Sequence, residues 1–539
     1  MNRAHPAATL AELPGDSPDS IERRRTLLRL SALSLAPLLP PGLGLLGSGT
    51  ALASVVHALP RVALVIGNSR YAAAPLDNPA NDANAIAAVL KQTGFAVSLQ
   101  LDARKAAMEE AIRSFAGGLA RQPAVGLFYF AGHGLQLNWR NFLVPVDAAL
   151  KSADDVSRHA VDITALLEGL ARAKNPMNII ILDACRDNPF DDNLKTTGKG
   201  LSQMDAPSGT LLAYATAPGN TASDGAGANG LYTSNLLREM RAPSARIEDV
   251  FKRVRLNVRR ASSGQQIPWE STSLEDDFYF LPPPELRKLS QEELERQFAE
   301  ELEAWNATDG AVTPAPIEAY LRRYPSGRFT ELALVRLDQM LARQGEKKVQ
   351  VVSAAANPFS QGTAVANLDY RVGDRYEYRV SDLLTKVEGA HRVQVVTEVT
   401  ASEVHYNKGK LITDLLGNML RRPSDGATFG PSQYFATEYS VGRKWSTRYS
   451  VTAPRFSATI EMDLHVVGRE TITVPAGTFD TFRIEGSGWT LEVGQQNTLT
   501  YWVAPGKVSR AVASENLWRK GNRIIRSDRE ELVSFTPAG

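Results

Sequence analysis

The sequence predicts an α/β domain over residues 61–281, built round a mainly parallel sheet flanked by helices. A short helical region and a C-terminal antiparallel β domain are expected to follow it. Short β-branched runs alternate with amphipathic stretches in the first part, and several of these runs are continuously apolar. In the last part the hydrophobic period changes to two. At 539 residues the chain exceeds the size of one hydrophobic core, so two or three domains are expected.

Strands and helices alternate within the α/β domain. The expected strands are 62–66, 96–101, 125–130, 179–182 and 210–214. The expected helices are 82–92, 105–120, 163–173, 232–240 and 247–260. Uninterrupted apolar runs suit strands that are covered on both faces, and ligands of such sheets bind beyond the carboxyl ends of the strands.

The rest of the chain divides into a helical region, 285–345, and a β region, 367–535. Ser290 and Glu293 form a capping box that predicts a charged connector helix. Two further helices, near 317–324 and 330–343, resemble one helix-turn-helix repeat. The β region is predicted to be an antiparallel sandwich or open barrel, and it holds no residue cluster that argues for chemistry.

Residues 1–53 have the pattern of a twin-arginine export signal. Arg24 and Arg25 precede the apolar run 30–46, and a small-residue cleavage site lies at 51–53. A membrane anchor is the alternative, but prolines break the apolar run short of the ~20 residues that a span needs. We therefore expect a periplasmic or secreted protein without a transmembrane anchor once the signal is removed.

The charge balance argues against nucleic-acid binding, and the cysteine count leaves one candidate thiol nucleophile. Lys and Arg number 60 against 59 Asp and Glu, which gives no field that would attract nucleic acid. Cys185 is the only cysteine, so no internal disulfide can form and no other thiol can act as a nucleophile.

Two segments, 130–134 and 182–187, carry the residues suited to catalysis. His133 lies between two glycines after one expected strand, and Cys185 follows the next one. The carboxyl ends of parallel strands meet at one edge of a sheet. A thiol needs a base to form thiolate at neutral pH, and His133 is the candidate. The amides of Gly134 and Cys185 are expected to hold an oxyanion.

These segments resemble the caspase and metacaspase family, in which a His lies about 50 residues before the catalytic Cys. Here the two residues are 52 positions apart, and residues 61–68 and 78–83 are also similar to the first strand and helix of the family. The resemblance covers residues 61–281. It implies a caspase-hemoglobinase fold and a cysteine endopeptidase that works through a His-Cys dyad on protein or peptide substrates.

The resemblance is to the bacterial metacaspase and orthocaspase branch more than to animal caspases. In metacaspases, aspartates at the positions of Asp82 and Asp183 line an acidic pocket, which implies cleavage after Arg or Lys. Tyr214, Ala215 and Asp224 lie where the family places its substrate-binding loops. No cofactor is implied. No spaced carboxylate loop of EF-hand form is present, and calcium activation is left open.

The residues alone also allow structural interpretations. Cys185 could be a buried core thiol and His133 a satisfied core histidine, while Asp82 and Asp183 could cap helices. Lys195 and Lys199 could mark a self-cleaved loop or an ordinary solvated one. The alternative function is a non-catalytic scaffold of the cell envelope that binds a partner through the C-terminal β domain. The other histidines have no spacing typical of metal ligands.

Overall fold

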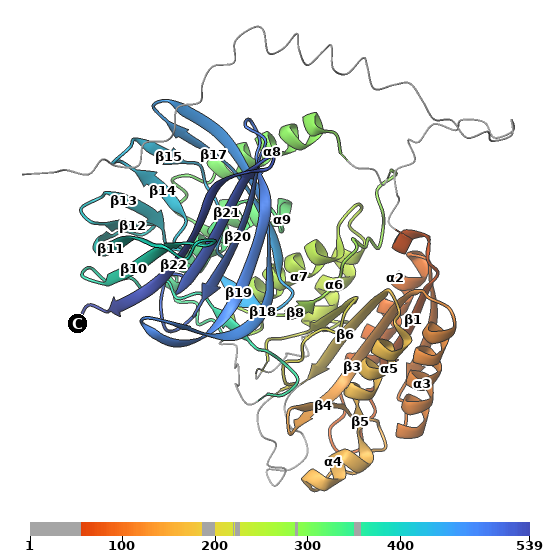
Figure 1. Ribbon diagram of the computed structural model, residues 1–539. Helices are drawn as coiled ribbons and strands as arrows, with labels where there is room; N and C mark the ends of the chain where they lie inside the picture. The colour runs from red at the N-terminus through yellow and green to blue at the C-terminus, as the bar shows by residue number, and fades with distance from the viewer. Residues whose placement is uncertain (1–54, 186–199, 219, 221–226, 286–288, 350–356) are drawn as a thin grey trace, which may run out of the picture. The chain divides into compact units, whose positions relative to one another are not determined.

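The computed structural model describes residues 55–185, 200–218, 220, 227–285, 289–349 and 357–539 (Figure 1). The predicted export signal therefore lies outside the described residues, as do Asp224, Lys195 and Lys199. A short 3-10 helix, η1 (Val55–Ala58), precedes the first strand. None of the helices in the described part of the chain has the length and apolar content needed to span a bilayer.

The α/β domain contains a mainly parallel sheet, which confirms the predicted fold class. Its strand order is β2-β1-β3-β6-β7-β8, and only β8 of this path runs antiparallel to its neighbour. The strands are β1 (Arg61–Gly67), β2 (Phe95–Leu101), β3 (Val125–Leu137), β6 (Met177–Cys185), β7 (Thr210–Tyr214) and β8 (Trp269–Thr272).

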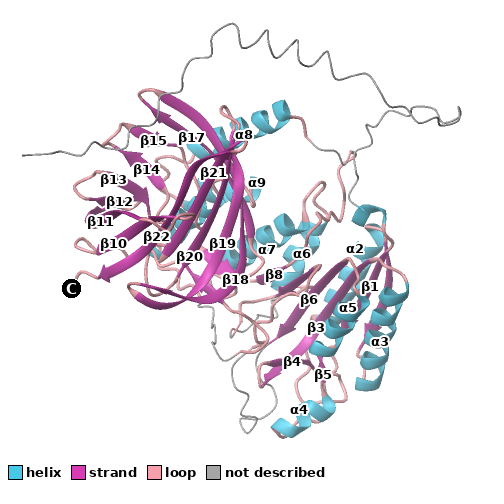
Figure 2. Cartoon of the chain, in the orientation of Figure 1, coloured by secondary structure: helices cyan, strands magenta, loops and turns pink. Residues whose placement is uncertain are grey.

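Helices cover both faces of this sheet (Figure 2). One face packs against α2 (Pro79–Gln92), α6 (Leu231–Met240) and α7 (Ile247–Ala261). The other packs against α3 (Lys105–Arg121) and α5 (Ile163–Ala173). Alternate residues of β3 enter the two cores, because successive side chains of a strand point to opposite faces. Tyr129 joins the first core and Phe128 the second, which explains the uninterrupted apolar run.

Strand β3 extends past the predicted end at 130 to Leu137. Its extension pairs antiparallel with β4 (Arg140–Leu143), which pairs with β5 (Val161–Asp162), and α4 (Ala153–His159) lies nearby in the chain. Gly132 has φ +151°, and a Cβ there would lie 2.5 Å from the Tyr71 hydroxyl. Position 132 therefore requires glycine. Because glycine has a low strand propensity, the sequence pattern did not predict this part of the strand.

The helical region forms α8 (Gln291–Asn306), α9 (Pro314–Arg323) and α10 (Thr330–Arg343). The predicted capping box at the start of α8 is present, with Ser290 and Glu293 satisfying each other's backbone N–H groups.

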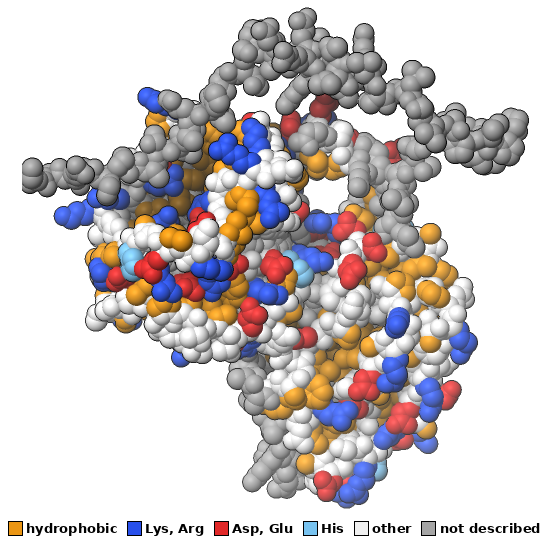
Figure 3. Space-filling view, viewed as in Figure 1, with side chains coloured by type: hydrophobic (Ala, Val, Ile, Leu, Met, Phe, Trp, Pro, Cys, Tyr) orange, Lys and Arg blue, Asp and Glu red, His pale blue; other side chains and the backbone are white. Residues whose placement is uncertain are grey.

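The C-terminal β region is antiparallel, which confirms that part of the predicted fold class, and it forms a closed barrel where a sandwich or an open barrel was expected. Strand β10 pairs with both β11 and β22, so the sheet has no free edge. The barrel strands are β10 (Arg375–Asp382), β11 (Glu388–Val399), β12 (Glu403–Tyr406), β13 (Leu411–Asp414), β14 (Met419–Arg422), β15 (Ala427–Phe429), β17 (Lys444–Ala453), β18 (Phe456–Val474), β19 (Gly477–Thr490), β20 (Gln495–Val503), β21 (Ala513–Lys520) and β22 (Arg523–Thr536). Two short strands outside it, β9 (Thr363–Val365) and β16 (Glu438–Ser440), pair with each other. On the face seen in Figure 3, positive and negative side chains are interspersed, in keeping with the net charge of +1.

Candidate active site

His133 and Cys185 are partners in neighbouring parallel strands. The pairing of β3 with β6 continues without a shift from Val125 and Met177 to His133 and Cys185. Neighbouring strands lie about 4.8 Å apart, so the two backbone positions lie side by side. Residues 52 positions apart in the chain are thus brought together at the carboxyl end of the sheet.

The ring of His133 is held in one tautomer. Its Nε2 lies 2.7 Å from the carbonyl oxygen of Ala74. A carbonyl oxygen can only accept, so Nε2 carries the proton and donates it. The lone pair of the neutral ring is then on Nδ1, which makes Nδ1 the atom able to accept a proton from a thiol.

Tyr71 fixes the backbone and the ring of His133. The backbone N–H of His133 donates to the Tyr71 hydroxyl across 3.0 Å, and that hydroxyl donates to the carbonyl of Val144, also across 3.0 Å. The two rings lie 4.4 Å apart between centroids. His133 is only 4% exposed, so the surrounding packing restricts its rotamer.

Asp183, two residues before Cys185, is held by hydroxyl groups. Its Oδ2 accepts from Thr233 Oγ1 at 2.6 Å and from the Tyr129 hydroxyl at 3.2 Å. Those two hydroxyls are 2.7 Å apart and belong to fully buried residues. The Asp183 carboxylate is thus held against two buried hydroxyl groups.

Asp82 is in the first turn of α2, and its carboxylate contacts the N-terminus of α6. Its Oδ1 accepts from the backbone N–H of Gly230 at 3.1 Å and from Asn229 Nδ2 at 2.8 Å. The positive end of the helix dipole favours a negative charge there. Burial raises the pKa of Tyr129 well above its ordinary value, and the charges of Asp183 and Asp82 raise it further. The charges of both predicted specificity residues therefore raise the pKa of the Tyr129 hydroxyl, and both residues flank the first turn of α6.

Gly134, Tyr214 and Ala215 are the other predicted site residues that the structure describes. A Cβ on Gly134 would lie 2.8 Å from Ala184 Cβ, so only glycine fits the close approach of β3 to β6. Tyr214 and Ala215, at the end of β7, are buried. The oxyanion role of Gly134 and Cys185, and substrate contact by Tyr214, Ala215 and Asp224, stay predictions.

Sequence reasoning missed the groups that orient the predicted site residues. Ala74 contributes a backbone oxygen, which no side-chain pattern can mark. In the sequence, Tyr71 is an ordinary loop residue and Tyr129 is an ordinary aromatic residue of a buried strand. Thr233 lies in the first turn of an amphipathic helix, where a threonine is unremarkable. Its role depends on a contact with a residue 50 positions away.

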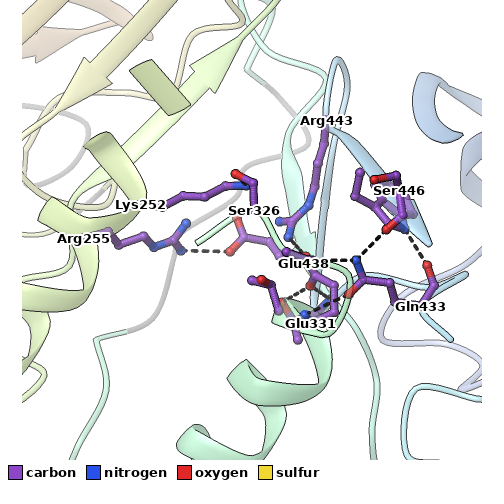
Figure 4. A network of polar contacts seen from close by, with 12 residues as sticks. Lys252, Arg255, Ser326, Glu331, Gln433, Glu438, Arg443 and Ser446 are labelled. Carbon is purple, nitrogen blue, oxygen red and sulfur yellow. Dashed lines mark hydrogen bonds and ion pairs between the residues drawn. The ribbon is translucent and has the colours of Figure 1, made fainter. Parts of the chain in front are cut away.

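A second polar cluster lies away from His133 and Cys185, around a cavity of about 930 Å³. Arg255 of α7 pairs with Glu438 at 3.0 Å, and Arg443 of the segment before β17 pairs with Glu331 of α10 (Figure 4). Burial alone would raise the pKa of Glu331, but Arg443 and hydrogen bonds from Thr437 lower it below its ordinary value. Partly buried ion pairs thus link Arg255 of α7 with Glu438 of β16, and Arg443 with Glu331 of α10.

Within the described residues, no group of three or more His, Cys, Asp and Glu side chains is arranged to hold a metal ion.

Comparison with known proteins places residues 60–279 in a family model described as the caspase domain. The human protein named mucosa-associated lymphoid tissue lymphoma translocation protein 1 is 30% identical over 161 residues. That alignment covers 30% of this chain and 19% of the human protein, and its mouse homolog matches to the same identity over 18% of its length. The chain thus spans less than a fifth of the curated relatives that it matches.

Proposed function

Because residues 60–279 form a caspase-like domain of the cysteine peptidase type, we propose that the protein is a cysteine endopeptidase with Cys185 as nucleophile and His133 as general base. The observation that carries the proposal is the register of β3 and β6, which makes these two residues direct partners. The bond from His133 Nε2 to the Ala74 carbonyl supports it, because it leaves Nδ1 as the proton acceptor.

In the proposed reaction, Nδ1 of His133 takes the thiol proton and the thiolate attacks the carbonyl carbon of the scissile amide. The tetrahedral oxyanion is held by the amides of Gly134 and Cys185. The C–N bond then breaks as the imidazolium gives its proton to the leaving amine. Water, deprotonated by His133, hydrolyses the thioester and releases the acid product and the free thiol.

The proposed substrates carry Arg or Lys before the scissile bond. Asp183 and Asp82 flank the first turn of α6, where their carboxylates accept hydrogen bonds from Thr233, Tyr129 and Gly230. A cationic side chain is attracted to such a pair, and an aspartate side chain is repelled by it. We further propose export by the twin-arginine route, with the peptidase acting in the periplasm or outside the cell.

The test uses two fluorogenic peptides that differ only in having Arg or Asp before the cleaved amide. Cleavage of the Arg peptide should vanish in Cys185→Ala and fall by about 10²- to 10⁴-fold in His133→Ala, as expected for loss of a general base. His159→Ala is the matched control, because His159 is an exposed histidine at the end of α4.

Equal cleavage by wild type, Cys185→Ala and His133→Ala would refute the peptidase proposal and leave the non-catalytic scaffold. Preference for the Asp peptide would refute only the proposed specificity for Arg or Lys.

A further inference from the structure

One end of the C-terminal barrel carries a series of exposed apolar side chains. Of the seven large hydrophobic residues that are exposed in the described barrel, 367–535, six lie at the tips of four hairpins. They are Leu384 and Val387 (58% and 65% exposed), Phe456 (43%), Trp489 (49%), and Ile524 and Ile525 (39% and 47%). We call the tips of these hairpins, residues 383–388, 453–457, 489–495 and 519–525, the apolar rim.

Strand pairing places the four tips at the same end of the barrel and next to one another. Asp382 pairs with Asp528, so the β10–β11 and β21–β22 tips are on one side. Gln496 pairs with Arg519, so the β19–β20 tip is next to the β21–β22 tip. Ile460 pairs with Thr490, so the β17–β18 tip is next to the β19–β20 tip. The strands concerned follow one another without interruption, from β11 through β10 and β22 to β17. Neighbouring strands lie about 4.8 Å apart, so the rim is a contiguous arc.

The charged residues of the rim are mostly basic. Five exposed cations alternate with the apolar side chains, namely Lys386, Arg455, Arg519, Lys520 and Arg523. No ion pair links any of them to a carboxylate within the described residues. The two acidic residues are engaged: Glu388 contacts His391 at 2.9 Å, and Glu492 accepts from the backbone N–H of Thr459 at 2.7 Å. The rim therefore carries more positive than negative charge.

We propose that the apolar rim is a docking surface for the headgroup region of an anionic lipid bilayer. An exposed apolar patch flanked by cations matches the two layers of such a surface, acyl chains below and anionic headgroups above. Tryptophan is enriched at this depth, and Lys and Arg side chains extend from it toward the phosphates. The side chains come from four separate hairpin tips, and a fluid interface admits each of them without a rigid matching surface. This proposal does not depend on the proposed peptidase activity.

The test is sedimentation of the full chain with vesicles of phosphatidylglycerol and phosphatidylcholine, compared with phosphatidylcholine alone. We expect binding to the anionic vesicles that weakens with salt. A variant with Arg455→Gln, Lys520→Gln and Arg523→Gln should bind roughly 100-fold more weakly, at about fivefold for each cation near an anionic surface. A variant with Phe456→Ser, Trp489→Ser and Ile525→Ser should lose at least about tenfold.

The matched control is Val372→Ser, because Val372 is a 61% exposed apolar residue next to the opposite end of β10. It should bind as the wild type does. Unchanged melting temperatures would show that the rim variants are folded. Absence of binding to both vesicle types, or equal binding by the control and the rim variants, would overturn the proposal. If neither vesicle type is bound, the alternative occupant of this surface is a protein.

Discussion

The hydrogen bond from Thr233 to Asp183 offers a sharp test of the proposed specificity site. Thr233→Val keeps the shape of the side chain but removes the hydroxyl that donates to Asp183 Oδ2 across 2.6 Å. Thr233 and its neighbour Tyr129 are both fully buried, whereas Asp183 is partly exposed. A hydrogen bond to a charged group contributes about 1.5–3 kcal/mol, and 1.36 kcal/mol corresponds to a tenfold change in rate.

The Tyr129 hydroxyl, 3.2 Å from the same oxygen, can take over part of the interaction. We therefore expect the lower end of that range, a loss of about tenfold in the preference for Arg over norleucine before the scissile bond. The assay is the ratio of kcat/KM for two peptides that differ only in that residue. Ser234→Ala is the control, because Ser234 is the next residue on α6 and its hydroxyl donates to the Leu231 carbonyl of its own helix.

A double-mutant cycle separates positioning from a general structural effect. If Thr233 acts through the Asp183 carboxylate, Thr233→Val should have little further effect in an Asp183→Asn background. An unchanged preference in Thr233→Val, or the same tenfold loss in both backgrounds, would refute the reasoning.

Three further outcomes are expected. Glu331→Ala leaves the partly buried Arg443 without this partner and should lower the free energy of unfolding by about 3 kcal/mol in urea titrations, more than replacing both residues with apolar ones. Because the folded-state pKa of Glu331 lies below its ordinary value of 4.5, its contribution to stability is present above that pH and is lost as the pH falls through the folded pKa. Glu331→Gln should therefore show a smaller loss of stability on acidification than the wild type, and parallel curves would contradict the assignment. Gly132→Ala forces a Cβ to within 2.5 Å of the Tyr71 hydroxyl and should lower peptidase activity by more than about tenfold, whereas Gly118→Ala, where a Cβ meets nothing within 4 Å, should retain it.

Local patterns predicted the elements whose own sequence determines them. The helices at 163–173 and 330–343 were predicted to the residue, because apolar spacing and flanking residues define both ends. The period of two in the last part of the chain correctly indicated antiparallel strands. The same period occurs in sandwiches and in barrels, so it could not reveal that β22 returns to pair with β10.

The strand positions of the candidate residues were predictable from the sequence, and the contacts that support them were not. His133 and Cys185 were placed together because each follows a buried strand, and the register of β3 with β6 agrees with that placement. The Ala74 carbonyl and the Tyr71 hydroxyl reach His133 from residues 59 and 62 positions away in the chain. Such contacts depend on the tertiary fold, and the glycines that permit them weaken the strand signal there.

The central claim is that His133 deprotonates Cys185, and the pH dependence of thiol alkylation tests it most directly. Cys185 is the only cysteine, so iodoacetamide reports on this thiol alone. A free thiol is only a few per cent ionised at neutral pH. We expect alkylation at pH 6.5 to be more than about tenfold faster in the wild type than in His133→Ala, with the two rates converging near pH 9.5, where the thiol ionises without help. Superimposable rate profiles for the two proteins across this range would contradict the account.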